Sequence, residues 1–137
     1  MLWASALAAV FLIAHLAFLP PTLEDLDSMN FALGVRDFDP SKHQPHPPGY
    51  PVFIALGKLS YAVWPSEAGS LSFWGALFGA LCVFPLVSLF RSVEALDHGS
   101  TDADRDRTAA IATPVVVASP LVWFSALRPL GVVPGPP

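Results

Sequence analysis

The feature that most constrains this chain is an uncharged stretch of 22 residues from Gly69 to Phe90, which Arg91 ends. As an α-helix it would be about 33 Å long, close to the roughly 30 Å of a bilayer's hydrocarbon core. It therefore predicts a membrane-spanning helix. Gly75 and Gly79 form a G-x-x-x-G pattern, which lets another helix approach closely. We interpret the pattern as packing within one larger helical bundle, in preference to a specific dimer.

The composition supports a lipid environment. Of the 137 residues, 53% are hydrophobic and 13% are charged, whereas about a quarter of the residues in an average soluble domain are charged. The net charge of −4 includes no basic block, so we expect the lipid bilayer as a partner and no nucleic acid. The single Cys82 cannot form an internal disulfide.

A first span is predicted over residues 2–19, where only Ser5 and His15 are polar. A cleavable signal peptide is the competing interpretation, but the segment has no basic start, because no Lys or Arg precedes Arg36. We expect His15 to have a hydrogen-bond partner, since an ionisable group inside a span is costly.

A third span is predicted over residues 108–127, which contain Pro114 and Pro120. Membrane helices tolerate proline where hydroxyls or neighbouring helices satisfy the freed carbonyls. Thr113 and Ser119 stand immediately before the two prolines.

Residues 20–68 form a long connection between the first two spans. Thr22 to Asp37 is compatible with an amphipathic helix, which Thr22 and Asp25 would cap weakly. Tyr50 to Trp64 is apolar but only fifteen residues long, which favours a helix lying at the membrane interface. A short tilted span is the alternative, and it would invert the orientation of everything downstream.

Basic residues set the expected orientation. Loop 91–107 has three Lys or Arg in seventeen residues, and connection 20–68 has three in forty-nine. The denser loop is expected in the cytoplasm and the long connection outside. The fold class predicted is thus an all-α, polytopic transmembrane bundle with three spans. Because three spans enclose a site poorly, we expect residues 1–137 to be the N-terminal part of a larger membrane domain.

The external connection carries the candidate site. Its acidic residues include Glu24 and Asp27, and a carboxylate held at the membrane surface can serve as a general base towards a hydroxyl. The prolines around His46 restrict the backbone and present the imidazole towards a phosphate-bearing headgroup. His43 and His46 could instead be half of a metal site, although no third ligand is evident.

Two motifs carry a resemblance to a known family: Asp27-Ser28-x-x-Phe31, and the run His46-Pro-Pro-Gly-Tyr-Pro51. Together they resemble the first external loop of GT-C membrane glycosyltransferases, particularly bacterial relatives of protein O-mannosyltransferases. The run Ser119-Pro-Leu-Val-Trp123 is similar to a turn that closes a later helix in that group.

The resemblance implies a multi-pass enzyme of the bacterial inner membrane that takes sugar from a polyprenyl-phosphate donor at the outer face. It implies Asp27 as the catalytic base and His46, with Glu24 and Tyr50, as substrate-binding residues. It leaves the sugar, the acceptor and any need for a divalent metal open. It also implies that this chain is truncated and inactive alone, because the family's later spans and donor-binding loops are missing. A small polytopic transporter or assembly subunit without catalytic activity is the alternative. A secreted soluble protein is disfavoured by the long uncharged spans.

Overall fold

The computed structural model describes residues 2–23, 26–45 and 47–127, and this part of the chain is helical without strands. The predicted all-α class is therefore confirmed for the described residues. The elements, in chain order, are α1 (Leu2–Ala17), α2 (Leu26–Arg36), the 3-10 helix η1 (Pro40–Lys42), α3 (Pro51–Val63), α4 (Glu67–Leu81), α5 (Val83–Glu94), α6 (Asp102–Val117) and α7 (Pro120–Leu127).

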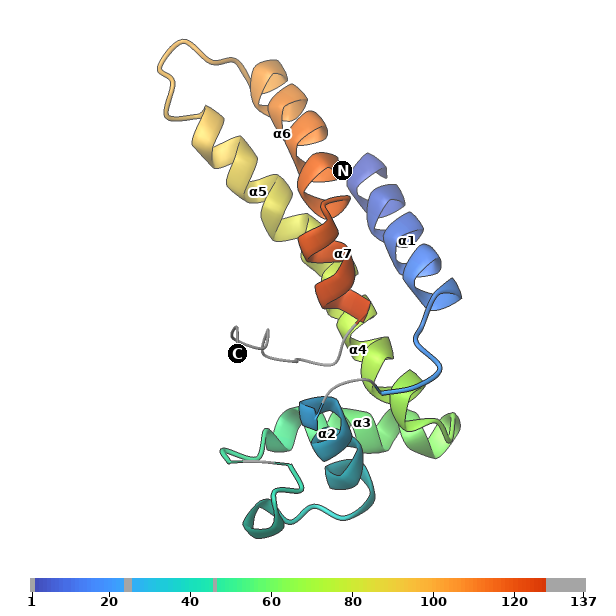
Figure 1. Ribbon diagram of the computed structural model, residues 1–137. Helices are drawn as coiled ribbons and strands as arrows, with labels where there is room; N and C mark the ends of the chain where they lie inside the picture. The colour runs from blue at the N-terminus through green and yellow to red at the C-terminus, as the bar shows by residue number, and fades with distance from the viewer. Residues whose placement is uncertain (1, 24–25, 46, 128–137) are drawn as a thin grey trace.

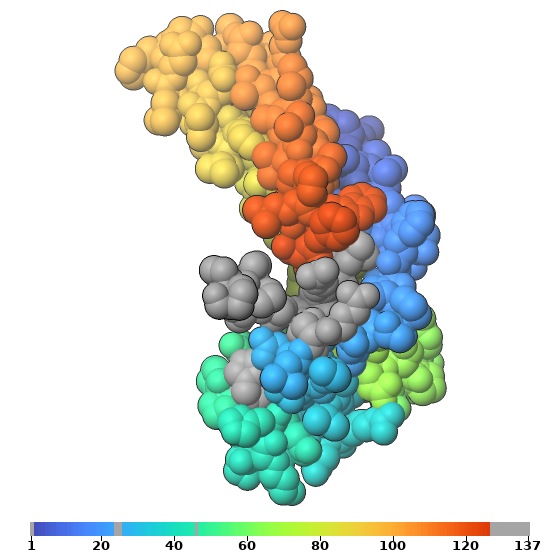
Figure 2. All heavy atoms as spheres, in the orientation of Figure 1, coloured from blue at the N-terminus to red at the C-terminus, as the bar shows by residue number. Residues whose placement is uncertain are grey.

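Helices α4 and α5 follow one another and form the long axis of the molecule (Figure 1). Helix α1 packs along α4, and α6 packs along α5. Helix α7 folds back onto α4, while α2 and α3 cover the other end of α4. The space-filling view shows the resulting elongated shape (Figure 2).

Two local signals shape the α4–α5 helix, one at its start and one at the break between its two parts. Ser66 caps α4, because its Oγ accepts a hydrogen bond from the Gly69 N–H at 3.1 Å. Pro85 has no N–H to donate to the Leu81 carbonyl, and this explains why α4 ends at Leu81 and α5 begins at Val83. Together α4 and α5 cover Glu67–Glu94, which is longer than the predicted span 69–90.

The third predicted span is broken. Helices α6 and α7 meet at a bend of 60° next to Pro120. Proline suits the first position of a helix, and the Ser119 Oγ accepts a hydrogen bond from the Val122 N–H at 3.4 Å. Thr113, the other hydroxyl predicted to support a proline, is fully buried and its Oγ1 has no hydrogen-bond partner among the described residues.

Fewer helices qualify as spans by length and composition than the three predicted. Within the described residues, length and composition qualify one helix to cross a membrane, the 28-residue run Glu67–Glu94. The bent pair α6–α7 makes a second span only if its two parts are taken as one, and α1 has 16 residues. The three-span bundle is therefore not established, because a bend and a short helix replace two of the continuous spans expected.

Two apolar clusters lie along the molecule. The first joins α1, α4, α5, α6 and α7 around Phe11 and Val83. The second joins α2, α3 and α4 around Phe31, Ile54 and Leu71. Helix α4 contributes to both clusters, so it connects the bundle end of the molecule to the end that carries the candidate site.

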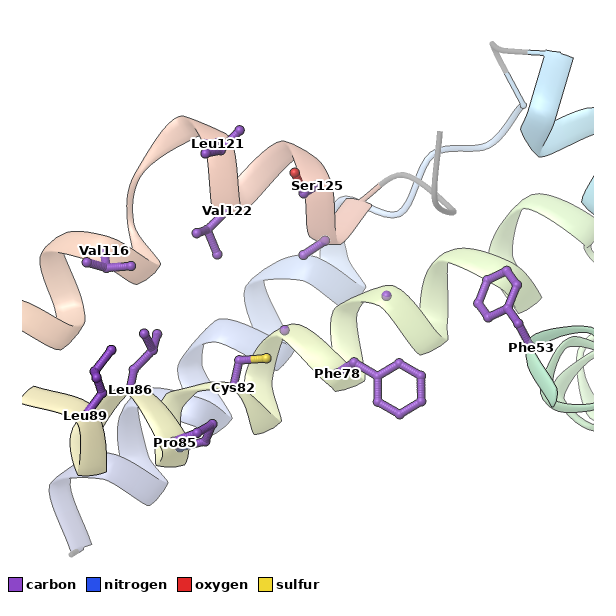
Figure 3. Close-up of a pocket in the computed structure, with 13 residues that line it drawn as sticks. Phe53, Phe78, Cys82, Pro85, Leu86, Leu89, Val116, Leu121, Val122 and Ser125 are labelled. Atoms are coloured by element: carbon purple, nitrogen blue, oxygen red, sulfur yellow. The ribbon is translucent and has the colours of Figure 1, made fainter. Parts of the chain in front are cut away.

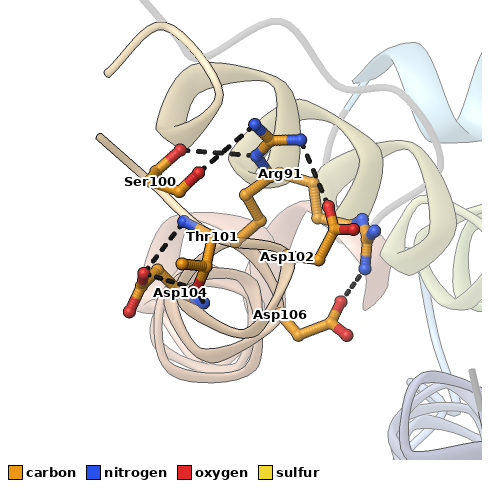
Figure 4. A network of polar contacts seen from close by, with 7 residues as sticks. Arg91, Ser100, Thr101, Asp102, Asp104 and Asp106 are labelled. Carbon is orange, nitrogen blue, oxygen red and sulfur yellow. Dashed lines mark hydrogen bonds and ion pairs between the residues drawn. The ribbon is translucent and has the colours of Figure 1, made fainter. Parts of the chain in front are cut away.

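The connection between α5 and α6 is held by polar contacts (Figure 4). Thr101 and Asp104 form a reciprocal capping box at the start of α6. Arg91 of α5 pairs with Asp106 of α6, and Arg105 pairs with Asp102 at 3.2 Å. Exposed ion pairs contribute little to the free energy of folding. These contacts therefore mainly define the geometry of the turn.

Replacing Gly57 of α3 with alanine is expected to destabilise the fold. Alanine favours a helix over glycine by about 1 kcal/mol, but here its Cβ would lie 2.8 Å from Val35 Cγ2 and 3.0 Å from Leu71 Cδ2. Overpacking of this kind costs about 1–3 kcal/mol. Thermal unfolding in detergent, followed by circular dichroism, should show a lower midpoint. Gly99→Ala is the control, because the nearest atom to its Cβ is 3.7 Å away; equal midpoints for both variants would contradict the packing argument.

Candidate active site

The loop between α2 and α3 is ordered by Asp39. Its carboxylate accepts hydrogen bonds from the Ser41 N–H at 3.0 Å and the Ser41 Oγ at 2.6 Å, and it pairs with the Lys42 ammonium at 3.0 Å. The Ser41 hydrogen bonds and Lys42 hold the pKa of Asp39 below its ordinary value. The carboxylate therefore caps η1 throughout the neutral range, and the cap is lost only as the pH falls through this lowered pKa.

The backbone of the same loop makes tight turns. Asp39 and Gln44 exchange backbone hydrogen bonds of 2.8 and 3.0 Å. Gly49 has a φ of 89°, a conformation that glycine adopts readily, and Tyr50 follows with a φ of 42° at the N-cap of α3. The loop thus turns sharply into α3 at Gly49 and Tyr50.

An aromatic cluster joins this turn to α2. Phe31 of α2 is 1% exposed. Its ring meets those of Tyr50 and Phe53 edge to face, each with 5.3 Å between centroids. Pairs of this geometry add stabilisation beyond their buried area. Phe31 therefore fixes where Tyr50 stands relative to α2.

Asp27 lies in the first turn of α2, one turn before Phe31. Residues four apart share one face of a helix, so Asp27 and Phe31 lie on the same side of α2. Asp27 is half-buried and its neighbour Ser28 is fully buried. The positive end of the helix dipole favours a carboxylate at this position.

The structure describes two of the four predicted site residues. Asp27 lies one turn before Phe31 on α2, and the Tyr50 ring packs on Phe31. Glu24 and His46 lie outside the described residues. His43 stands exposed in the turn after η1 with a φ of 59°, and no group of three His, Cys, Asp or Glu side chains gathers around a common point in the described ranges.

A second feature was not predicted from the sequence. An apolar pocket of about 590 Å³ lies between α4, α5 and α7 (Figure 3). Its lining includes Gly75, Cys82, Leu86, Val122 and Ser125, and Phe53 of α3 reaches its edge. Phe53 also packs on Phe31 of α2, so one ring contacts both the pocket and the aromatic cluster.

No curated protein and no solved structure matches this chain. One family model matches, the Protein O-mannosyl-transferase TMEM260 N-terminal domain, over residues 42–129. The matched range begins in the η1 turn and runs through α3 to the end of α7. Because it covers more than half of the residues, this chain belongs to the family of the TMEM260 protein O-mannosyl-transferase N-terminal domain.

Proposed function

We propose that this chain is the N-terminal portion of an integral membrane mannosyltransferase that takes its sugar from a polyprenyl-phosphate donor at the non-cytoplasmic face. The observation that carries the proposal is the family match, which includes the proline-rich loop and α3 together with α4 to α7. The same match disfavours a transporter or assembly subunit. The corresponding location is the bacterial inner membrane, with several passes supplied by this chain and the rest of the enzyme.

The surface of α3 supports a position at the membrane interface. Val52, Leu59 and Val63 lie on its outward face, and all three are more than half exposed. An exposed apolar stripe of this kind is unfavourable in water and favourable at a lipid surface. Lys58 stands exposed on the same helix, where its long side chain can extend to the headgroups. α4 follows α3 after a short link, so the interface helix would lead directly into the span.

In the proposed reaction, the acceptor's hydroxyl oxygen attacks the anomeric carbon of the sugar, and the bond to the carrier phosphate breaks. Asp27 takes the proton that the hydroxyl loses, and the phosphate leaves on the carrier. Asp27 in the first turn of α2 supplies the carboxylate group that a general base requires. His46, Glu24 and Tyr50 are proposed to bind the donor; of these, Tyr50 stands beside Phe31.

The proposed topology predicts opposite labelling at the two ends of the molecule. In a Cys82→Ser background, Asp37→Cys in the external loop should react with an impermeant maleimide in intact cells. His98→Cys in the α5–α6 connection should react only after permeabilisation. Both native residues are exposed, so accessibility within the protein does not limit either reaction. The reverse pattern would overturn the orientation and the outward-facing site together.

Replacing Asp27 with asparagine is expected to abolish most of the transfer activity. The product of the complete gene should be assayed with polyprenyl-phosphate mannose. The rate should fall by roughly 10²–10⁴-fold, as is typical of a lost general base, with donor binding little changed because the side chain keeps its size. His46→Ala should instead weaken donor binding.

The matched control is Asp39→Asn. Asparagine can still accept the Ser41 hydrogen bonds that cap η1, and Asp39 lies outside the Asp27 motif. We expect a change of less than about fivefold, as for other exposed charges. Equal losses at Asp27 and Asp39 would show that the loop's total charge matters and no single base exists. An unchanged rate in Asp27→Asn would remove the proposed mechanism.

A further inference from the structure

Gly34 is a buried residue in the last turn of α2 that the proposed reaction does not use. Glycine is less favourable than alanine in a helix, so its presence here needs a separate explanation. A left-handed helix cap is not the explanation, because Gly49 is the glycine with a positive φ among the described residues. The neighbours of Gly34 supply the reason.

The ring of Pro45 occupies the space that a side chain at position 34 would need. A Cβ on Gly34 would lie 2.7 Å from Pro45 Cδ and 3.0 Å from the Pro45 nitrogen. Ile54 Cδ1 of α3 approaches the same point to 3.0 Å. Pro45 is fully buried, and its ring is closed onto the backbone, so it cannot turn aside as a flexible side chain would. A side chain at position 34 would therefore push the backbone at Pro45 away from α2.

This contact lies on the face of α2 that carries Asp27. Gly34 comes seven residues after Asp27 and three after Phe31, spacings that place residues on one side of a helix. The loop that contains Pro45 meets the same face again at its end, where the Tyr50 ring packs on Phe31 with 5.3 Å between centroids. The loop therefore contacts α2 at two points one turn apart, Gly34 and Phe31.

Contacts within the loop give it a shape of its own. Asp39 and Gln44 exchange backbone hydrogen bonds. A Cβ on Gly49 would lie 3.1 Å from Pro40 Cγ and 3.5 Å from Phe38 Cζ, so these two side chains pack over the turn that leads into α3. The loop is thus folded on itself, and its contacts with Gly34 and Phe31 place it against α2.

We propose that Gly34 is a positioning residue, which lets the proline-rich loop, residues 37–50, lie close enough to α2 for Tyr50 to pack one turn from Asp27. The inference rests on the proposed function, in which Tyr50 binds the donor and Asp27 takes the acceptor's proton. Displacement of Pro45 moves Tyr50, which follows five residues later, relative to Asp27. A misplacement of about 1 Å between reacting groups can cost about 10²-fold in rate.

Gly34→Ala in the product of the complete gene tests the proposal. With polyprenyl-phosphate mannose as the donor, kcat/KM should fall by about ten- to a hundredfold. The loss should appear mainly as a higher KM for the donor, because the loop with Tyr50 moves while Asp27 stays in α2. Asp27→Asn should show the opposite division, with a lower kcat and an unchanged KM for the donor.

Gly57→Ala is the matched control. Its Cβ would be as crowded as that of Gly34→Ala, but the nearest atoms belong to Val35 and Leu71, which lie outside the loop. It should lower the midpoint of unfolding and leave the KM for the donor unchanged. A second readout follows the loop directly. The Lys42 side chain is 64% exposed, and trypsin cleavage of the Lys42–His43 bond, measured by mass spectrometry, should be faster in Gly34→Ala than in Gly57→Ala, because a loop released from α2 is more accessible to the protease.

Equal donor KM values and equal cleavage rates in the two glycine variants would overturn the proposal, since Gly34 would then contribute to stability alone. Faster cleavage in Gly34→Ala, in an enzyme that transfers no mannose from the polyprenyl-phosphate donor, would refute the proposed function and support the docking of the loop on Gly34. If Gly34→Ala fails to fold, Pro45→Ala replaces it, because it removes the ring that packs on Gly34. Its loop should be cleaved faster than that of Pro47→Ala, which alters an exposed proline of the same loop; equal rates would contradict the docking.

Discussion

Close packing of small residues along α4 holds both ends of the molecule together. At one end Leu71 of α4 joins the cluster of Phe31 and Ile54. At the other end Ala80 joins the cluster of α1, α5, α6 and α7, and Gly79 admits Phe11 and Ala126 to van der Waals contact. In lipid, apolar burial gives helices little reason to associate, so close backbone approach at small residues supplies the attraction.

The end that carries the candidate site uses a different chemistry. There the Trp74 Nε1–H of α4 donates to the Leu56 carbonyl of α3 at 2.8 Å, and the Ser60 hydroxyl bridges α3 and the Ser70 carbonyl. Buried polar groups of this kind define one relative placement of two helices, because other placements leave them unsatisfied. Arg36 and Glu67 add an ion pair between α2 and α4. The loop that leads into α3 is therefore attached to helices whose relative positions are held by these contacts.

A series of contacts connects the candidate site to the apolar pocket. Asp27 lies one turn before Phe31 on α2, and the Tyr50 ring packs on Phe31. Phe53 packs on Phe31 and also lines the apolar pocket, to which α7 contributes Val122, Ser125 and Ala126. A polar site at the surface and an apolar pocket towards the span suit an amphiphilic substrate, in agreement with the proposed lipid-linked donor.

Several elements could be predicted from the sequence because their causes are local. The uncharged run predicted the α4–α5 helix. Of the G-x-x-x-G pattern, Gly79 lies where Phe11 and Ala126 approach closely, whereas Gly75 lines the pocket. The interface position of α3 stays a prediction, as do the roles of Asp27, Glu24, His46 and Tyr50. The length of α1 and the bend at Pro120 were not predicted. Hydropathy shows which residues are apolar, but it does not show where a helix ends or bends.

The sequence by itself thus determined the helical class and the position of the longest helix, since each depends on residues close together in the chain, and it also carries the family match over residues 42–129. Only the tertiary structure decided which distant groups meet. His15 contacts Trp123 across 108 positions, Phe31 meets Tyr50 and Phe53, and α7 bends back to wall the pocket. These contacts follow from how helices pack in three dimensions. The sequence pattern of one segment does not show which other segment its side chains will contact.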